Sequence, residues 1–368
     1  MEVVHVRLKK RSDDSYPIFI GQDLFSFIAH DLKKRNIGNK YAIIADTTSS
    51  KLFGKKLVEE IQKVGLTVSL ITFKEGEQNK NLKIYAEIME AVAHADLDRK
   101  SAIIGLGGGV SGDLAGFVAA TYMRGIRYVH VPTTLLAMVD SSIGGKTGVD
   151  LRERKNAAGA FHQPQAVYSD IATLNSLPRA QISSGLAEII KHGVIADKKL
   201  FSFIEENNGK IMSKNNNVLI HSIKENARIK GSIIEKDEKE GDLRVVLNYG
   251  HTIGHAIESL TKYKKFSHGE AIAIGMNVAA HISMYLNFMP KEDVERQKKL
   301  LKNAGLPVSF PTIHPAAIIN ELHKDKKSFG HGIVFTLPER IGKVKRIKNS
   351  YRISVDKAMI RKAIEACK

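Results

Sequence analysis

Cysteine and long apolar runs are both scarce in this sequence. Cys367 is the single cysteine among 368 residues, so the chain cannot form an internal disulfide. No stretch approaches the roughly 18 to 20 consecutive apolar residues that a membrane-spanning helix requires. The first residues, MEVVHVRLKKRSDDSY, also lack the apolar run and the small-residue cleavage site of a signal peptide. We therefore expect a cytoplasmic protein that does not bind a membrane.

Negative charge is in deficit, because 56 lysines and arginines face 39 aspartates and glutamates and give a formal net charge of +17. A basic excess of this size is typical of proteins that bind the phosphates of nucleic acids. Here, however, the basic residues are spread along the chain, from Lys9, Lys10 and Arg11 to Lys345 and Arg346. Such scatter is typical of a solvated surface, and net charge informs association more than fold. We expect no nucleic-acid partner, although a small anionic substrate would be attracted by the same field.

The length indicates two domains, because single hydrophobic cores stop growing at about 250 to 300 residues. In the first half, short β-rich runs alternate with stretches of helical apolar spacing. The β-rich runs are 41–45, 68–73, 101–106 and 128–131, and the helical stretches are 52–64 and 82–94. This alternation predicts a parallel α/β sheet with crossover helices, which binds ligands beyond the C-terminal ends of its strands.

After about residue 178 the pattern changes to long amphipathic segments, which predict a mainly helical second domain. These segments are 185–196, 217–234, 251–260, 270–286 and 291–304. Near the end, 333–337 and 343–347 predict a small hairpin, and 355–366 predicts a closing helix. We place an α/β domain at 1–175 and a helical domain at 176–368.

A glycine-rich turn follows the apolar run AIIGL. Gly107, Gly109 and Gly112 in GGGVSGD have the spacing of a dinucleotide-binding turn, and 114–120 is helix-like. Glycines let the backbone approach a pyrophosphate, and a helix N-terminus directs N–H groups at it. The alternative is an ordinary tight turn. No acidic residue lies about 20 positions downstream, where a standard fingerprint has its ribose-binding group, so Asp46 after the upstream strand is the better candidate.

The stretch 131–150, VPTTLLAMVDSSIGGKTGVD, is rich in hydroxyls and glycines and follows a predicted strand. It predicts a polar loop that faces a ligand. Thr133 and Thr134 can donate hydrogen bonds to a cofactor, and Lys146 and Lys155 can bind a carboxylate or a phosphate. A solvated loop with a helix cap is the alternative.

In SSGLAEIIKHG, Glu188 and Lys191 are three residues apart and therefore share one helix face, with Ser183 or Ser184 placed to cap the helix start. A carboxylate on a mostly apolar helix needs a partner. Taken alone, the segment favours a simple Glu–Lys pair on the surface.

Three histidines follow in RVVLNYGHTIGHAIE and HGEA. His251 and His255 are four residues apart on one predicted helix, and His268 precedes the next. With a distant glutamate they could bind a divalent metal, the alternative being structural histidines. A zinc-protease motif is excluded because Thr252, rather than glutamate, follows His251.

Together these segments resemble the 3-dehydroquinate synthase family. The matching segments, in order, are EGEQNK at 75–80, GGGVSGD, PTTLLAMVDSSIGGKTGV, GLAEIIKHG, NYGHTIGHAIE, HGEA and DKK. They cover most of the chain, which makes the resemblance far more specific than the glycine turn alone. It implies an α/β N-terminal Rossmann-like NAD-binding domain and a mainly α-helical C-terminal metal-binding domain.

The resemblance also implies residue roles. It puts a divalent metal, zinc with cobalt as the alternative, on Glu188, His251 and His268, which leaves His255 as a catalytic or substrate-contacting group. It implies NAD contacts at Asp46, Glu75, Gly76, Glu77, Gln78, Asn79, Lys80, Gly109, Val110, Ser111, Gly112, Asp113, Thr133, Thr134, Lys146, Lys155, Thr173, Leu174, Asn175 and Ser176. It implies substrate contacts at Arg124, Asp140, Lys146, Asn156, Lys191, Lys230, Arg244, Asn248, His255 and Lys326.

Of these residues the resemblance gives catalytic roles to Lys146, Lys191, Arg244, Asn248 and His255, and it adds Glu240 for proton transfer. Arg124 matches an arginine that reaches the site of a neighbouring subunit, which implies a homodimer.

The implied activity is that of a phosphate-eliminating carbon–oxygen lyase. It converts 3-deoxy-D-arabino-heptulosonate 7-phosphate to 3-dehydroquinate and phosphate by transient oxidation, elimination, reduction, ring opening and aldol closure. The alternatives are another sugar phosphate cyclase, or a metal-dependent polyol-phosphate dehydrogenase. Lys230, Arg244, Asn248 and His255 match the pattern of the dehydroquinate-forming enzymes, which favours the first activity and an anionic sugar-acid phosphate as substrate.

Overall fold

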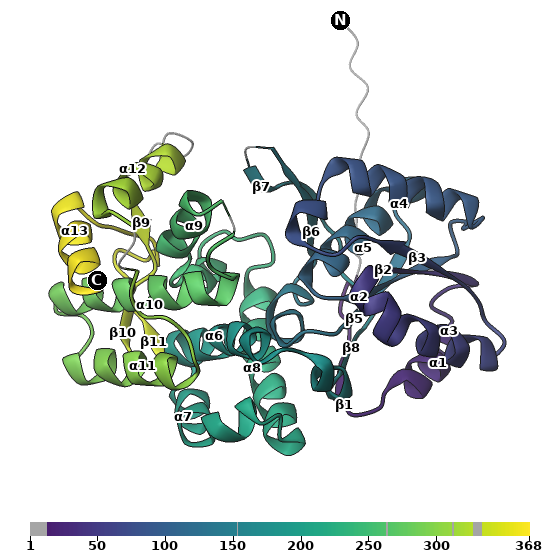
Figure 1. Ribbon diagram of the computed structural model, residues 1–368, viewed down its shortest axis with the longest axis horizontal. Helices are drawn as coiled ribbons and strands as arrows, with labels where there is room; N and C mark the ends of the chain where they lie inside the picture. Colours follow the sequence, from purple (N-terminus) through teal and green to yellow (C-terminus); the bar gives the residue numbers. More distant parts are fainter. Residues whose placement is uncertain (1–12, 153, 263, 311–312, 327–332) are drawn as a thin grey trace, which may run out of the picture.

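The computed structural model describes residues 13–152, 154–262, 264–310, 313–326 and 333–368, and the side chains of 324–326 also lie outside the described part. A parallel sheet with its helices forms one half of the molecule, and a group of helices forms the other (Figure 1). The predicted fold class is therefore confirmed. The division at residue 175 stays a prediction. The last strand of the large sheet ends at Asp170, and the first α-helix of the helical half begins at Arg179.

All neighbouring strands of the six-stranded sheet are parallel, in the order β1-β8-β5-β4-β2-β3. The strands are β1 Ile18–Gly21, β2 Lys40–Asp46, β3 Thr67–Phe73, β4 Ala102–Gly107, β5 Arg127–Pro132 and β8 Val167–Asp170. Four of them confirm the predicted strands, and β1 and β8 add an edge that the sequence pattern did not indicate. Since the strands are parallel, their C-terminal ends meet at one edge of the sheet.

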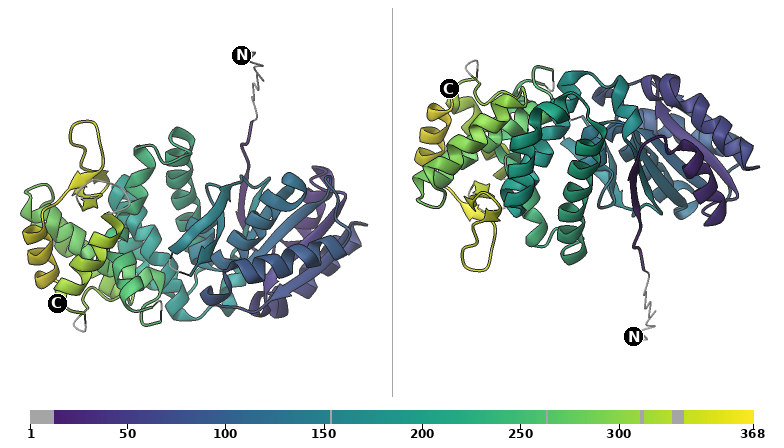
Figure 2. Two further views of the ribbon diagram at one scale, coloured as in Figure 1. Left: turned by 90° about the horizontal axis from the view of Figure 1, so that it is seen from above. Right: turned by 90° about the horizontal axis from the view of Figure 1, so that it is seen from below.

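Helices cover both faces of this sheet, as the two views of Figure 2 show. Successive side chains of a strand point to opposite faces, so neighbours in β2 pack in different cores. Ile43 packs with the helices α1 Phe25–Lys34 and α3 Lys55–Lys63. Ile44 packs with α4 Leu82–His94 and α5 Gly109–Thr121 on the other face. Burial on both faces explains why inner strands such as β2 and β4 are nearly continuous apolar runs.

The stretch 131–150 is not a single loop, and that prediction is wrong. After β5 it forms a π-helical turn at Ala137–Ser141 and then β6 Lys146–Leu151, which pairs antiparallel with β7 Arg154–Phe161. The two strands lie so close together that a Cβ on Gly148 would be 2.6 Å from the carbonyl oxygen of Ala158. Gly144 and Gly145 lie before β6 with positive φ, as in a turn, whereas Gly148 lets the two strands approach each other.

The second half is mainly helical, as predicted. Its helices are α6 Arg179–Ala196, α7 Lys198–Met212, α8 Asn216–Lys236, α9 His251–Leu260, α10 His268–Tyr285, α11 Lys291–Asn303, α12 Pro315–Lys326 and α13 Lys357–Ala366. In the described part of the chain, no helix has both the length and the apolar character needed to cross a membrane.

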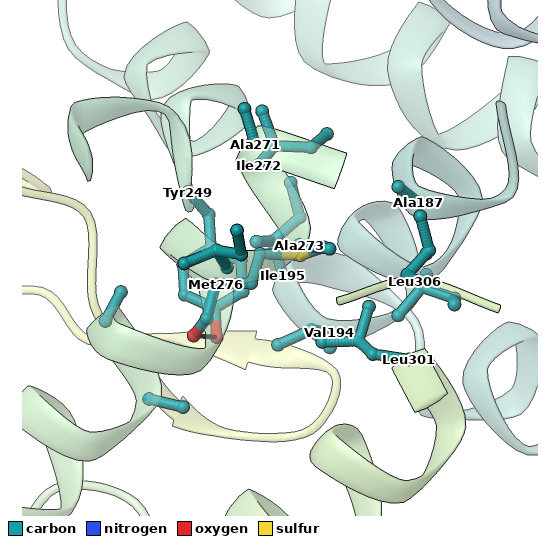
Figure 3. Close-up of a cluster of buried hydrophobic side chains, with 14 of the residues drawn as sticks. Ala187, Val194, Ile195, Tyr249, Ala271, Ile272, Ala273, Met276, Leu301 and Leu306 are labelled. Atoms are coloured by element: carbon teal, nitrogen blue, oxygen red, sulfur yellow. Dashed lines mark hydrogen bonds between the residues drawn. The ribbon is translucent and has the colours of Figure 1, made fainter. Parts of the chain in front are cut away.

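The core of this half forms around α6 and α10, which are buried on nearly every side. Figure 3 shows Ala187 and Val194 of α6 in the same cluster as Ala273 and Met276 of α10. Tyr249 is buried beside them and donates its hydroxyl to the carbonyl of Met276 at 3.1 Å. A helix buried all round shows little amphipathic pattern, so any polar side chain on it needs a partner inside the protein.

Two local predictions in this half are corrected by the structure. The strand β10 Pro338–Arg340 pairs with β11 Lys343–Val344, and β9 Val334–Phe335 pairs with β12 Ile353–Ser354. The predicted hairpin is present, but its first strand is Pro338–Arg340 rather than 333–337, because the chain reverses at Ile341 and Gly342, whose φ is +88°. Ser183 and Ser184 do not cap α6 either, since this helix begins at Arg179 after Pro178 and both serines lie buried inside it.

Candidate active site

The predicted cofactor residues gather at the C-terminal edge of the parallel sheet. Asp46 ends β2, Glu75 to Lys80 follow β3, Gly109 to Asp113 follow β4, Thr133 and Thr134 follow β5, and Thr173 to Ser176 follow β8 in a 3-10 turn. Four of these five strands are direct neighbours in the order β8-β5-β4-β2, and β3 lies beside β2. The edge of a parallel sheet is where α/β folds bind ligands.

Asp46 lies directly against the glycine turn. Its carboxylate accepts hydrogen bonds from the Ser111 hydroxyl at 2.9 Å and from the Ser49 backbone N–H at 2.8 Å. A Cβ on Gly107, whose φ is +145°, would lie 2.9 Å from this carboxylate. The structure therefore brings Asp46 and the turn together, while the role of Asp46 toward a ribose stays a prediction.

The helix α5 begins at Gly109, so its free N–H groups face the sheet edge. The helix approaches the sheet closely at Gly112, where a Cβ would lie 2.0 Å from the ring of His130 in β5. His130 is buried, and burial lowers its pKa to about 4. Glycine at 112 is thus required for the packing of α5 against β5.

Lys80 connects the glycine turn to the β6–β7 hairpin. Its ammonium group lies 2.5 Å from Asp113 of α5 and 2.5 Å from the side-chain oxygen of Asn156 of β7. Burial lowers the pKa of Lys80, but the carboxylates of Asp113, Glu77 and Asp150 together outweigh burial and the pKa is raised overall, so this lysine is charged. A predicted cofactor residue, Lys80, and a predicted substrate residue, Asn156, are therefore in direct contact.

Glu188, His251 and His268 converge from three different helices. Oε1 of Glu188 lies 3.5 Å from Nε2 of His251 and 3.3 Å from Nε2 of His268. One ligand atom from each of the three residues lies within 4.8 Å of the other two. The predicted metal ligands are thus adjacent in space, although 80 residues separate the outer two.

The donor set fits a divalent metal. Nδ1 of His251 lies 3.2 Å from the carbonyl oxygen of Tyr249, which can only accept, so Nδ1 carries the proton and Nε2 offers its lone pair toward Glu188. Burial lowers the pKa of His251 well below its usual value and keeps the ring neutral. Burial raises the pKa of Glu188, but Lys191 and the histidines outweigh it and hold the pKa well below the usual value. Two imidazoles and one carboxylate are typical ligands of a catalytic metal.

The Glu188–Lys191 pair is not on the surface, and that interpretation is wrong. Nζ of Lys191 lies 2.5 Å from Oε2 of Glu188, and both side chains are at most 2% exposed. Because α6 runs through the core, the polar face that the spacing predicted is turned toward other polar residues rather than toward solvent.

A second buried ion pair lies nearby, where Lys230 of α8 is 2.6 Å from the Asp140 carboxylate. Burial and the positive charge of Lys191 lower the pKa of Lys230, and the Asp140 carboxylate raises it. Burial has the largest effect, so the pKa of this lysine is lowered overall.

Further contacts join the two halves around this cluster. Arg244, in the 3-10 turn Leu243–Asn248, donates to the carbonyl of Gly144 at 3.2 Å and also to the carbonyl of Glu238. Lys146 lies 2.8 Å from Glu240. The contacts of Arg244 with Gly144 and of Glu240 with Lys146 join the helical half to the sheet half, so these predicted substrate residues lie at the junction of the two halves.

Four predicted site residues are not part of this buried cluster as the structure describes it. His255 and Asn248 are exposed, and the ring centre of His255 is 5.2 Å from that of His251. Arg124 is exposed beyond the C-terminal end of α5, about 20 Å from the glycine turn at 1.5 Å per residue. Lys326 is the last residue of α12, and its side chain lies outside the described part.

Two polar groups at the site were missed by sequence reasoning. Glu258 of α9 is buried and lies 3.4 Å from Nδ1 of His268. His192 of α6 is buried beside Glu188 and Asp140, and its Nδ1 lies 2.6 Å from Asn226, which donates to the carbonyl of Val139. The signals for Glu258 were its i,i+3 spacing from His255 on an amphipathic helix, which is too common to be diagnostic, and its place at the end of the matching segment NYGHTIGHAIE.

Comparisons with known proteins agree with this fold and site. The crystal structure of 2-deoxy-scyllo-inosose synthase complexed with carbaglucose-6-phosphate, NAD+ and Co2+ superimposes with a TM-score of 0.88, at 29% identity, over 95% of this chain and 96% of that chain. The 2-epi-5-epi-valiolone synthase of Streptomyces hygroscopicus has a TM-score of 0.89 at 24% identity, over 98% and 99% of the two chains. The chain therefore has the same fold as these two synthases.

Sequence comparisons identify the family. The family descriptions "3-dehydroquinate synthase N-terminal" and "3-dehydroquinate synthase C-terminal" match residues 70–184 and 185–328. The 3-dehydroquinate synthase of Thermodesulfovibrio yellowstonii is 45% identical over 94% of this chain and 96% of its own length. That of Pelotomaculum thermopropionicum is 43% identical over 93% and 92%. The chain belongs to the 3-dehydroquinate synthase family.

Proposed function

We propose that this chain converts 3-deoxy-D-arabino-heptulosonate 7-phosphate to 3-dehydroquinate and phosphate, as a phosphate-eliminating carbon–oxygen lyase of the shikimate pathway. One observation carries the proposal: a sheet edge suited to a dinucleotide, a Glu188–His251–His268 cluster and several cations meet at one junction. Relatives named for this activity share 43 to 45% of their residues with the chain over nearly the full length of both.

We propose NAD as the cofactor. Asp46 lies where it can accept from the ribose, and the N-terminus of α5 lies where it can bind the pyrophosphate. Glu75 to Lys80, Thr133, Thr134, Lys146, Lys155 and Thr173 to Ser176 would surround it. When bound, NAD supplies a hydride acceptor that later returns the hydride to the same substrate. The solved cyclase with NAD+ bound, at 29% identity, supports this assignment.

We propose zinc as the metal, with cobalt as the alternative, held by Glu188, His251 and His268. Three protein ligands leave positions open for substrate oxygens, as in other catalytic sites. The metal supplies a Lewis acid that makes a substrate hydroxyl more acidic. His255, exposed next to these ligands, would contact the substrate or relay a proton near neutral pH.

The cations at the junction would bind the phosphate and the carboxylate of the substrate. Lys146, Lys191, Lys230 and Arg244 supply positive charge, while Asp140, Asn156 and Asn248 position hydroxyl groups. Glu240, which lies 2.8 Å from Lys146, would accept and return a proton during the reaction. Lys326 is a further proposed substrate contact.

We also propose a homodimer in the cytoplasm. Arg124 is exposed at the end of α5 away from the glycine turn, so in this chain it contributes little to the site described above. It would instead reach the site of a neighbouring subunit. A monomer at assay concentrations with full activity would contradict this.

The decisive experiment is phosphate release from 3-deoxy-D-arabino-heptulosonate 7-phosphate with NAD at catalytic concentration. We expect many turnovers per NAD and no net NADH, because oxidation and reduction occur on one bound substrate. NADH that accumulates in proportion to product would indicate a dehydrogenase instead. The structural likeness to 2-deoxy-scyllo-inosose synthase makes a hexose phosphate without a carboxylate the control substrate, and faster turnover of that control would indicate a different cyclase.

A further inference from the structure

Glu258 has no assigned role, yet it lies at the centre of the junction. It is on α9, 3% exposed, with Oε1 3.4 Å from Nδ1 of His268 and 4.0 Å from Nζ of Lys155. Lys155 in turn lies 2.8 Å from Glu77, in the segment after β3. A buried carboxylate is unfavourable unless it is paired, so its two partners explain why it is tolerated there.

The two nitrogens of His268 face two different carboxylates. Nε2 lies 3.3 Å from Glu188, and Nδ1 lies 3.4 Å from Glu258. When the Glu258 carboxylate accepts a hydrogen bond from Nδ1–H of His268, the proton stays on Nδ1 and the Nε2 lone pair is left for a metal. The same hydrogen bond fixes the orientation of the imidazole ring.

Close helix packing holds this arrangement. A Cβ on Gly275 of α10 would lie 1.9 Å from the carbonyl oxygen of Gly250, directly before α9. One on Gly254 would lie 3.2 Å from Ile272. Glu258 and His268 are therefore carried by two helices whose separation can change very little.

We propose that Glu258 is a positioning residue for the metal site: it accepts from Nδ1–H of His268 and directs Nε2 toward Glu188 and His251. Lys155, whose Nζ lies 4.0 Å from the same oxygen Oε1, balances the charge of the carboxylate. This inference rests on the proposed function, because it requires that His268 binds a metal.

The test compares substitutions at 258 that keep side-chain length. Glu258→Met removes the acceptor, and Glu258→Gln restores an uncharged one. Metal-free full-length chains are titrated with Co2+ against a chromophoric chelator, and the visible spectrum of the bound Co2+ is recorded. We expect Glu258→Met to bind Co2+ about 10- to 100-fold more weakly, with an altered spectrum, as when other carboxylate partners of ligating histidines are lost. Glu258→Gln should recover part of the affinity and the native spectrum.

The matched control is Glu270→Gln. Glu270 lies two residues from His268 and accepts from the backbone of Ser267 in the capping box of α10. Glutamine also serves in a capping box, so Co2+ affinity should stay within about twofold. An equal loss in this control would show that any change at the start of α10 weakens the site, and would overturn a specific role for Glu258.

Two other outcomes would overturn the inference. Co2+ affinity and spectrum in Glu258→Met equal to those of the parent chain would remove the positioning role while leaving the proposed function intact. Two Co2+ ions per parent chain and one in Glu258→Met would make Glu258 a ligand of a second ion. By contrast, a parent chain that neither binds Co2+ nor releases phosphate would refute the proposed function itself.

Discussion

The two halves of this molecule build their parts of the site in different ways. In the sheet half, short loops at the ends of parallel strands supply the residues, and the topology alone makes them neighbours. In the helical half, Glu188, His251 and His268 come from separate helices and meet only because α6 and α10 are buried in a common core. The sheet thus provides a binding edge, while the helices provide a buried cluster whose charges depend on one another.

The largest effect should separate the two histidines of α9. His251→Ala removes one of three metal ligands, so we expect loss of tightly bound metal and a fall in turnover of roughly a thousandfold, about 4 kcal/mol. His255→Ala should keep the metal and still lose most activity. Metal content and phosphate release are measured on the same preparations.

Equal metal loss in both variants would make His255 a ligand. Full activity of His255→Ala would remove its catalytic role. Either result would change how the helical half builds its site.

A pH effect on stability should come from the sheet half. The pKa of His130 is about 4 in the folded chain, against an ordinary value of 6.5, because burial disfavours the charged form. The unfolded chain therefore binds the proton first, so the stability contributed by this group is complete above pH 6.5 and is lost as pH falls toward 4. The loss amounts to about 3 kcal/mol.

Urea unfolding between pH 7.5 and 4.5 measures this effect. His130→Gln carries no titrating group, so its free energy of unfolding should fall less steeply than that of the parent chain. If the free energy of unfolding falls equally steeply with pH in the two proteins, His130 does not titrate as its burial implies.

Lys146 tests the junction between the halves. Its side chain is 51% exposed, so Lys146→Ala should leave unfolding nearly unchanged but lower kcat/KM by about 10- to 150-fold, the equivalent of about 1.5 to 3 kcal/mol for a charged hydrogen bond. Lys343→Ala, which removes an exposed lysine paired with Glu339, is the control and should behave like the parent chain. Unchanged kcat/KM in Lys146→Ala would exclude it from the site.

The smallest effects should come from two glycines. Gly112→Ala places a Cβ 2.0 Å from the His130 ring, so α5 must shift, with a loss of about 1 to 3 kcal/mol of stability and weaker NAD binding. Gly209→Ala in α7 meets nothing within 4 Å and should stabilise the chain by about 0.5 to 1 kcal/mol. Chemical unfolding and NAD titration measure both variants, and a stable Gly112→Ala with normal NAD binding would contradict the close packing.

Much of the sheet half could be predicted from sequence. Continuous apolar runs such as β4 mark strands buried on both faces, and Gly107 to Gly112 mark the turn that follows. Asp46 could be selected because a parallel sheet aligns its C-terminal ends, so distance along the chain matters little. The β6–β7 hairpin could not be predicted, because its glycines are required by close strand pairing and resemble those of a loop.

In the helical half, the sequence by itself determined the presence of most helices and, through the family's motifs, the identity of candidate metal ligands. Only the tertiary structure decided that Glu188 and Lys191 are buried rather than exposed, and that Glu258 and His192 belong to the same polar cluster. The physical reason is that spacing within a helix shows which residues share a face, but not whether that face meets solvent, an apolar core or another set of charges. That depends on how α6, α8, α9 and α10 pack, and their packing is a property of the whole chain.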